Sequence, residues 1–165
     1  MIIGIVCTDK NWGIGKNNDL LFHLKKDMQF FKNTTADSIV FCGYNTLLSF
    51  PGSKPLKGRS TICLCPDEIN RDDCFCIHNF EDAIRLVKEI SKTTNVFVIG
   101  GAMLYQSMLP YYDKVYVNKV DADGEPDVFF PNLDELPDYT SYLTLPIIDD
   151  EGYQTQLVLY KRGDN

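Results

Sequence analysis

The alternation of apolar and polar stretches along the chain predicts an α/β protein. Short apolar runs, typical of buried strands, alternate with segments of helical periodicity over roughly the first two thirds of the sequence. Such alternation favours a substantially parallel sheet with helices on its faces. The predicted strands cover residues 1–7, 38–43, 59–65, 74–77 and 96–100, and the predicted helices cover about 24–34, 44–50, 80–92 and 102–110.

The last third of the chain carries strand patterns without a helical pattern between them. Residues 114–120, about 140–147 and 153–161 each read as a strand. Consecutive strands of this kind pair as antiparallel hairpins, so we expect a hairpin at the sheet edge and therefore a mixed sheet. No repeat, low-complexity tract or linker interrupts the sequence, and 165 residues suit one domain, so residues 1–165 are predicted to form a single domain.

One carboxylate lies on the apolar side of the first predicted helix. At 3.6 residues per turn, Leu24, Met28 and Phe31 share a face, and Asp27 falls on the same stripe. A buried ionised carboxylate is costly unless it is paired. Asp27 is either an acid near a helix start that complements the helix dipole, or a half-buried group beside Phe31 that binds a cationic or amidine-like ligand.

Composition and charge narrow the class of ligand. The net charge of -7 argues against a nucleic-acid or anionic-membrane partner, because both bind preferentially to a positively charged surface. A small-molecule ligand stays open. If that ligand is anionic, local cations must reverse the overall field, and Lys54 and Arg59 are the candidates.

The sequence favours a cytosolic, reduced setting. The start MIIGIVCTDK lacks a basic lead and its apolar run is short, so it does not resemble a signal peptide, and no apolar stretch approaches the ~18 residues of a membrane helix. The six cysteines are then predicted to be free thiols. Cys63, Cys65, Cys74 and Cys76 form two C-x-C pairs, a spacing closer than that of structural zinc ligands, so no metal site is predicted.

Two strand-to-helix junctions carry glycine. FCGYNT and VIGGAMLY place glycines where backbone N–H groups at a helix start could bind a phosphate, although glycine also serves tight strand–helix packing. The long polar segment TDKNWGIGKNNDL, residues 8–20, is predicted to be a functional loop, because loops of that length in compact domains usually are.

The remaining polar features favour ordinary surface roles. Residues 121–151 contain no Lys or Arg and begin with DADGEPD, which departs from a calcium loop at Pro126 and Asn132, so these acids are interpreted as solvated loop residues. His23 and His78 are interpreted as polar surface histidines, since no nucleophile is near either of them in sequence.

The ordered set of motifs resembles the dihydrofolate reductase family over nearly the whole chain. The matching segments are IIGIVC, WGIGKNNDL, LKKDMQFFK, VFCGYNT, KPLKGR, VIGGAMLY, KVYVNKVDADGEPDVFFP and YQTQLVLYK. The resemblance implies an α/β fold with a mixed, mostly parallel eight-stranded sheet flanked by four helices. It also implies hydride transfer from NADPH to C6 of 7,8-dihydrofolate, with a proton delivered to N5, in a cytoplasmic monomer.

The resemblance also assigns roles to residues. Asp27 is implied to be the catalytic acid that hydrogen-bonds the 2-amino group and ring nitrogen of the pterin, as the only ionisable group of that pocket. Arg59, with Lys54 nearby, would take the α-carboxylate of the glutamate tail. The lid (residues 9–24) would cover the nicotinamide, with DADGEPD as its supporting neighbour. The implied substrate-binding residues are Ile5, Val6, Phe22, Met28, Phe31, Phe50, Lys54, Arg59, Ile99 and Asn118. The implied cofactor-binding residues are Cys7, Ile14, Gly15, Leu20, Gly43, Tyr44, Asn45, Thr46, Leu64, Cys65, His78, Gly100, Gly101, Ala102, Met103, Leu104 and Tyr105.

This chain departs from the family pattern at both ends of the implied site. Leu21 and Phe22 replace the usual Pro-Trp, and Asn118 replaces a common Thr opposite Asp27. The residues expected around the 2'-phosphate lack the usual cations: they are Tyr44, Cys65, Pro66 and His78. NADPH is therefore the implied cofactor, with preference over NADH relaxed. The alternatives are a pyrimidinone reductase of riboflavin synthesis and a non-catalytic nucleotide-binding module on the same scaffold.

Overall fold

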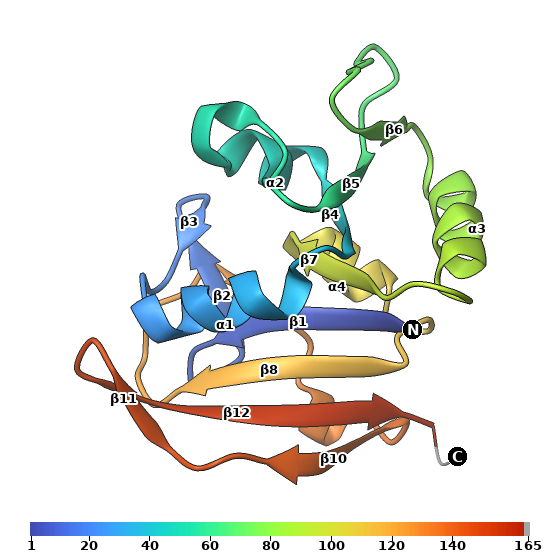
Figure 1. Ribbon diagram of the computed structural model, residues 1–165. Helices are drawn as coiled ribbons and strands as arrows, with labels where there is room; N and C mark the ends of the chain where they lie inside the picture. Colours follow the sequence, from blue (N-terminus) through green and yellow to red (C-terminus); the bar gives the residue numbers. More distant parts are fainter. Residues whose placement is uncertain (164–165) are drawn as a thin grey trace.

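A single mixed sheet organises the protein, and a computed structural model describes its residues 1–163 (Figure 1). The strands are β1 (Ile2–Thr8), β4 (Ile39–Gly43), β5 (Ser60–Leu64), β6 (Phe75–Ile77), β7 (Val96–Gly100), β8 (Lys114–Val120), β10 (Tyr139–Thr144) and β12 (Tyr153–Arg162). Over the described range these eight strands follow the order β10-β12-β8-β1-β7-β4-β5-β6, and β11 (Ile148–Asp150) adds a short ninth that pairs with β12.

The pairing directions confirm the mixed, mostly parallel sheet. The six strands from β8 to β6 pair in parallel, whereas β12 runs antiparallel to β8 and to β10. The predicted edge hairpin is therefore confirmed. The strand β11 was not predicted, because the segment before residue 153 carries no alternating pattern of its own and forms a strand only by pairing with β12.

The sheet carries helices on both faces. The described chain contains four α-helices, α1 (Lys25–Thr35), α2 (Tyr44–Ser49), α3 (Phe80–Ile90) and α4 (Ala102–Ser107), with short 3₁₀ turns at Pro51–Ser53 and Leu133–Glu135. Figure 1 shows α1 in front of the sheet and α4 behind it. Phe30 and Phe31 of α1 pack on Ile3 and Ile5, while the α3 and α4 side chains join the larger core on the opposite face.

The long polar segment after β1 is not a plain loop, which corrects the prediction for residues 8–20. It folds into β2 (Gly13–Lys16) and β3 (Asp19–Leu20), and β2 pairs with β9 (Val128–Phe129) in a small three-stranded sheet. Because β9 lies more than a hundred residues further along the chain, no local pattern marks this pairing.

The apolar stripe of α1 also needs a correction. Met28 was expected on the buried face, but 52% of its surface is exposed, whereas Leu24 is only 2% exposed. The helix turns Asp27 and Phe31 inwards and Met28 outwards, because neighbouring residues of a helix differ by about 100° in direction. The helix after β7 ends at Ser107, three residues before the predicted end at Pro110. No helix within residues 1–163 has the length and apolar character needed to cross a membrane.

Candidate active site

Asp27 occupies the inner side of α1, facing the two central strands. Asn118, in β8, donates a hydrogen bond from Nδ2 to Asp27 Oδ1 at 2.9 Å, across 91 residues of sequence. Burial raises the pKa of the Asp27 carboxyl, and the hydrogen bond from Asn118 partly offsets that rise. Asp27 is therefore a half-buried acid held in place by a neutral amide, the arrangement expected of a group that meets a ligand cation.

A second carboxylate, missed by sequence reasoning, lies beside Asp27. Asp150 is only 1% exposed, so the interpretation of residues 121–151 as solvated acids is wrong at this position. Its oxygens accept hydrogen bonds from the backbone N–H groups of Lys26, at 3.1 Å, and Asp27, at 3.0 Å. Asp27 is thus not the only ionisable group near this pocket, and the charge of Asp150 further raises the Asp27 pKa.

A cleft of about 690 Å³ runs along α1, between this helix and the segment that carries Leu56 and Arg59. Its lining residues are His23, Leu24, Lys25, Met28, Gln29, Phe31, Lys32, Leu56, Arg59 and Glu151. Arg59 donates from Nε and Nη2 to the Lys57 carbonyl, at 3.0 and 2.7 Å, and from Nη1 to Thr35 Oγ1 at 3.3 Å. These contacts fix the guanidinium plane at the cleft. Lys54, which was expected to assist Arg59, is not among the described residues that line the cleft, whereas Lys32 is.

The apolar wall around Asp27 contains most of the predicted residues. Ile5 and Phe31 share one buried cluster with Ile99, and Ile99 also joins the cluster that holds Phe50. Val6 is an exception, because successive residues of a strand point to opposite faces, and its side chain packs in the core on the α3 and α4 side.

Phe22 packs against the hairpin that carries Asp150. Its ring meets the ring of Tyr153, in β12, edge to face with centroids 5.0 Å apart. Phe22 replaces the family's usual Trp. The contact with Tyr153 holds its aromatic side chain just before the start of α1. Leu21, the other departure, lies against Gly124, where an added Cβ would come within 3.0 Å of Leu21 Cδ1.

The two glycine junctions meet at the carboxyl ends of β4 and β7, which are neighbouring strands. Gly43 precedes α2, and Gly100 and Gly101 precede α4. Gly100 has φ of 121°, a conformation that favours glycine, and a Cβ there would lie 3.3 Å from the Tyr105 ring. A Cβ on Gly101 would lie 3.4 Å from Thr46 Oγ1. The predicted phosphate residues therefore form one cradle that side chains would fill.

Other predicted cofactor residues surround this cradle or support it. Leu104 and Tyr105 are buried, and the Tyr105 hydroxyl donates to the Ile5 carbonyl at 2.8 Å. Asn45 and Met103 are exposed on the first turns of α2 and α4, beside the half-buried Ala102. Cys7 lies in β1 on the Asp27 side, where burial and the charges of Asp27 and Asp150 raise its pKa well above the ordinary thiol value.

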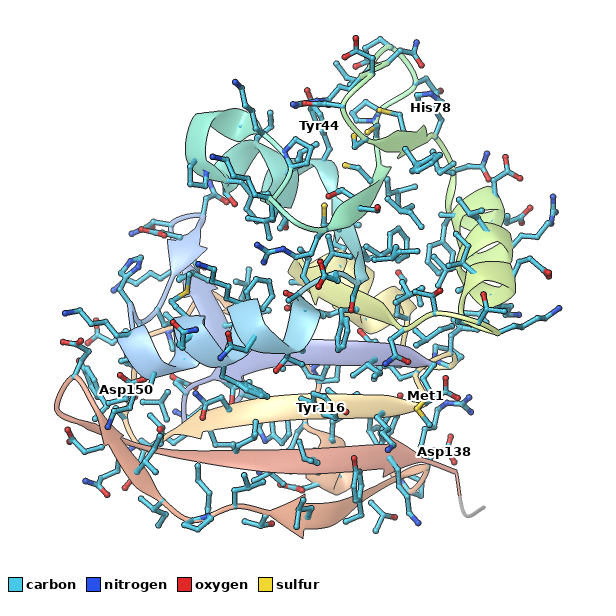
Figure 2. The ribbon with its side chains drawn as sticks, viewed as in Figure 1. Met1, Tyr44, His78, Tyr116, Asp138 and Asp150 are labelled. Atoms are coloured by element: carbon cyan, nitrogen blue, oxygen red, sulfur yellow. The ribbon has the colours of Figure 1, made fainter. Side chains whose placement is uncertain are left out.

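The adenosine end is formed by α2 and the β5–β6 region, where Figure 2 shows Tyr44 and His78 at the opposite end of the molecule from Asp150. Leu64 ends β5 and Cys65 is buried beside Tyr44. His78 contacts the Pro66 carbonyl through Nδ1, at 3.0 Å, and Asn70 Oδ1 through Nε2, at 3.1 Å. Both ring nitrogens therefore already hold the loop in shape.

The lid is tied to residues 121–127, as predicted for DADGEPD. Asp127 accepts a hydrogen bond from Asn17 N–H at 3.0 Å and donates its own N–H to the Gly15 carbonyl at 2.9 Å. Ile14 packs partly into the core, whereas Leu20 at the tip is 56% exposed. Asp9, which sequence reasoning left without a role, is 2% exposed and accepts three backbone hydrogen bonds at the base of the lid.

No group of three or more His, Cys, Asp or Glu side chains within residues 1–163 is arranged to hold a metal ion. A glycine-lined junction at the carboxyl ends of parallel strands, together with a half-buried carboxylate and an apolar wall, is typical of an oxidoreductase that binds a dinucleotide beside a ring-shaped substrate. The fold and the site together define that class of protein.

Comparisons with known proteins identify the family. Residues 1–162 match the family model described as dihydrofolate reductase. The chain is 36% identical over 134 residues to dihydrofolate reductase of Staphylococcus haemolyticus, covering 79% of this chain and 78% of that protein. It is 30% identical over 181 residues to the mouse enzyme, covering 97% and 96%. A dihydrofolate reductase from Enterococcus faecalis, complexed with NADP(H) and RAB-propyl, superposes with a TM-score of 0.86 at 25% identity, over 99% of this chain and 97% of that one.

The chain therefore belongs to the dihydrofolate reductase family. It is an NADPH-dependent oxidoreductase that reduces 7,8-dihydrofolate to 5,6,7,8-tetrahydrofolate in one-carbon metabolism. The fold and activity implied by the sequence resemblance are confirmed, and neither the pyrimidinone reductase nor the non-catalytic alternative is supported.

Proposed function

We propose that Asp27 anchors the pterin ring of dihydrofolate by accepting hydrogen bonds from its 2-amino group and ring nitrogen. The observation that carries this proposal is the Asp27 carboxylate itself, which faces the apolar wall, is held by Asn118 at 2.9 Å and has a raised pKa. A two-donor edge on the ligand complements two carboxylate oxygens, and the low-polarity surroundings strengthen that pairing.

The rest of the substrate follows the cleft along α1. The ring lies against Ile5, Phe31 and Ile99, which exclude water from the reacting face. Arg59, oriented by Thr35 and the Lys57 carbonyl, takes the α-carboxylate of the glutamate tail as a fork. Lys32 supplies a second cation in the same cleft, so an acidic protein presents a locally basic end to an anionic substrate.

The glycine cradle holds the cofactor pyrophosphate. Gly43, Thr46, Gly100 and Gly101 fit this role, because glycine leaves the backbone N–H groups and the Thr46 hydroxyl uncovered at this junction, and only Gly100 requires glycine for its φ of 121°. NADPH, when bound, supplies the hydride that reduces C6 of dihydrofolate. The lid, hydrogen-bonded to residues 121–127, covers the nicotinamide through Ile14 and Gly15.

Solvent delivers the proton to N5. Asp27 pairs with the other side of the pterin, so its part is to orient the ring and favour protonation rather than to donate at N5. The cofactor site keeps NADPH but with relaxed preference over NADH, because Tyr44, Cys65 and Pro66 offer no cation to a 2'-phosphate. We also propose a monomer, with residues 1–165 as one domain, acting in the cytoplasm.

Asp27→Asn tests the proposal. The carboxamide keeps the shape and the Asn118 contact but loses the charge, so kcat/KM for dihydrofolate should fall on the order of 10²-fold near neutral pH. Turnover is followed as loss of the nicotinamide absorbance on adding dihydrofolate, with and without methotrexate. Far-UV circular dichroism and the KM for NADPH serve as controls and should match the wild type. Unchanged turnover would remove Asp27 from the mechanism.

A further inference from the structure

The β11–β12 hairpin places a buried carboxylate at the start of α1. Asp150 is 1% exposed, and its Oδ1 and Oδ2 accept the N–H groups of Lys26 and Asp27 at 3.1 and 3.0 Å. Figure 2 shows Asp150 at the end of the sheet where α1 lies. Asp27 and Asp150 are 123 residues apart in the sequence, so this is a tertiary contact rather than local capping.

The helix has no local substitute for this contact. Its N-cap residue is Leu24, which has no side-chain oxygen and makes no side-chain capping bond in the described structure. The first turn of a helix leaves backbone N–H groups unpaired unless an outside acceptor reaches them. Asp150 supplies that acceptor, and one of the two N–H groups belongs to Asp27 itself.

We propose that Asp150 is a positioning residue for catalysis, which fixes the Asp27 backbone and sets the electrostatic surroundings of its carboxylate. The proposal rests on the role of Asp27 proposed above. The bonded N–H fixes where the Asp27 side chain leaves the helix, while the Asn118 contact fixes where that side chain ends. Because both the backbone and the carboxylate of Asp27 are held by hydrogen bonds, its two oxygens face the pterin edge in a defined orientation.

The groups that face Asp27 come from three elements besides its own. They are Cys7 of β1, the neutral amide of Asn118 in β8, and Asp150 of β11, with the buried hydroxyl of Tyr105 further off. Within residues 1–163 the only one of these formally charged is Asp150. The neighbouring Lys26 directs its Nζ away, to the Asp149 carbonyl at 2.6 Å. Removing the charge of Asp150 should therefore lower the proton affinity of Asp27.

The test is a direct titration of Asp27 in the apo protein. Aspartate carboxyls are labelled with ¹³C, the Asp27 signal is assigned by its loss in Asp27→Asn, and its shift is followed against pH. The Asp27 pKa should be clearly lower in Asp150→Asn than in the wild type. Asp149→Asn is the matched control, because it removes one charge from the adjacent exposed position and should leave the Asp27 titration unchanged.

Kinetics give the second readout. Asp150→Ala removes both acceptors, so KM for dihydrofolate should rise on the order of tenfold while KM for NADPH changes less than about twofold. Asp150→Asn, which keeps one acceptor oxygen, should show a smaller rise and covers the case in which the alanine variant fails to fold. An Asp27 titration identical in Asp150→Asn and wild type, or equal losses for both substrates, would overturn the proposal. Because the titration needs no turnover, it stands apart from the Asp27→Asn test of the function.

Discussion

At the scale of single residues, the Asp27 carboxyl is held in an environment that favours its neutral form. Burial raises its pKa above the ordinary value of 3.8, and Asp150 adds to the rise. Because its pKa is raised on folding, the Asp27 carboxyl binds a proton more tightly in the folded protein than in the unfolded chain. The free energy of unfolding therefore decreases as pH rises from 3.8 through the pKa of the folded state. Asp27, the proposed ligand-binding acid, therefore lowers the stability of the empty enzyme at neutral pH.

The raised pKa of Asp27 predicts that Asp27→Asn is more stable than the wild type at pH 7. The free energy of unfolding, measured by urea titration, should be higher for the variant at pH 7, and the difference should shrink as pH is lowered towards 3.8, where the wild-type carboxyl also becomes neutral. Asp67→Asn, which removes one charge from an exposed position, serves as the charge-matched control. If Asp27→Asn were less stable than the wild type at every pH between 3.8 and 7, burial of the Asp27 carboxylate would not be destabilising, and the prediction would be wrong.

The sequence identified Asp27 but not its surroundings. Helical periodicity set the acid on an apolar stripe, and the family resemblance supplied Asn118 as its partner, which the 2.9 Å contact confirms. Periodicity could not decide between Asp27 and Met28 for the inward direction, because the stripe is wider than one residue. Asp150 carried no signal, since its contacts join segments that are remote in sequence.

At the scale of elements, the lid depends on one buried acid at its base. Asp9 is 2% exposed, and its carboxylate accepts the N–H groups of Asn11 and Gly13, both at 2.8 Å, and of Gly124 at 3.1 Å. The same side chain thus shapes the turn that enters β2 and fastens it to the segment after β8. The close fit continues at Gly13, where an added Cβ would lie 2.2 Å from Pro126 Cγ.

Asp9→Ala should loosen the lid and weaken the fold. One buried N–H group, that of Gly13, and two part-buried ones, those of Asn11 and Gly124, lose a charged acceptor, so the free energy of unfolding should fall by about 3 kcal/mol, measured by urea titration. The rate of hydride transfer in single-turnover experiments should fall as well, because the base of the lid loses the contacts that order it. Asp19→Ala is the control within the same lid, since Asp19 is exposed and its contacts, to the Leu20 N–H and the exposed His23, are both local. Equal losses in both variants would contradict the role of Asp9.

The elements themselves were largely predictable, apart from β11 and the small sheet formed by β2, β3 and β9. Strands and helices with long periodic patterns, such as α3 and β12, lie within a few residues of their predicted bounds. The strands β2, β3 and β9 were missed because they are short and exist by pairing with one another across the chain.

At the scale of the whole molecule, the distribution of charge bears on the proposed preference for cofactor. The net charge is -7, and Arg71, a cation that interacts with Tyr44, is engaged by Asp73 at 2.7 Å and donates to the Ser53 carbonyl. Its pKa is raised, chiefly by the hydrogen bond to Asp73. Neither the overall field nor this paired guanidinium offers strong attraction to a 2'-phosphate.

We therefore predict a reduced preference for NADPH. The ratio of kcat/KM values for NADPH and NADH should be below about a thousandfold, measured with saturating dihydrofolate. Tyr44→Arg, which restores a cation beside this site, should raise the ratio by about 10- to 100-fold through one charge-assisted contact. A wild-type ratio of a thousandfold or more, or a Tyr44→Arg variant with an unchanged ratio, would contradict the relaxed preference.

The sequence by itself determined the class of fold, the family and the identity of Asp27, because these depend on periodicity within segments and on the order of motifs along the chain. The tertiary structure decided which carboxylates are buried and which partners they meet. Asp150 of β11, which accepts N–H groups from the first turn of α1, and Asp9 at the base of the lid are examples. Both arise where strand pairing brings distant segments within hydrogen-bonding distance, and such contacts depend on the folded arrangement of the sheet rather than on any local pattern of residues.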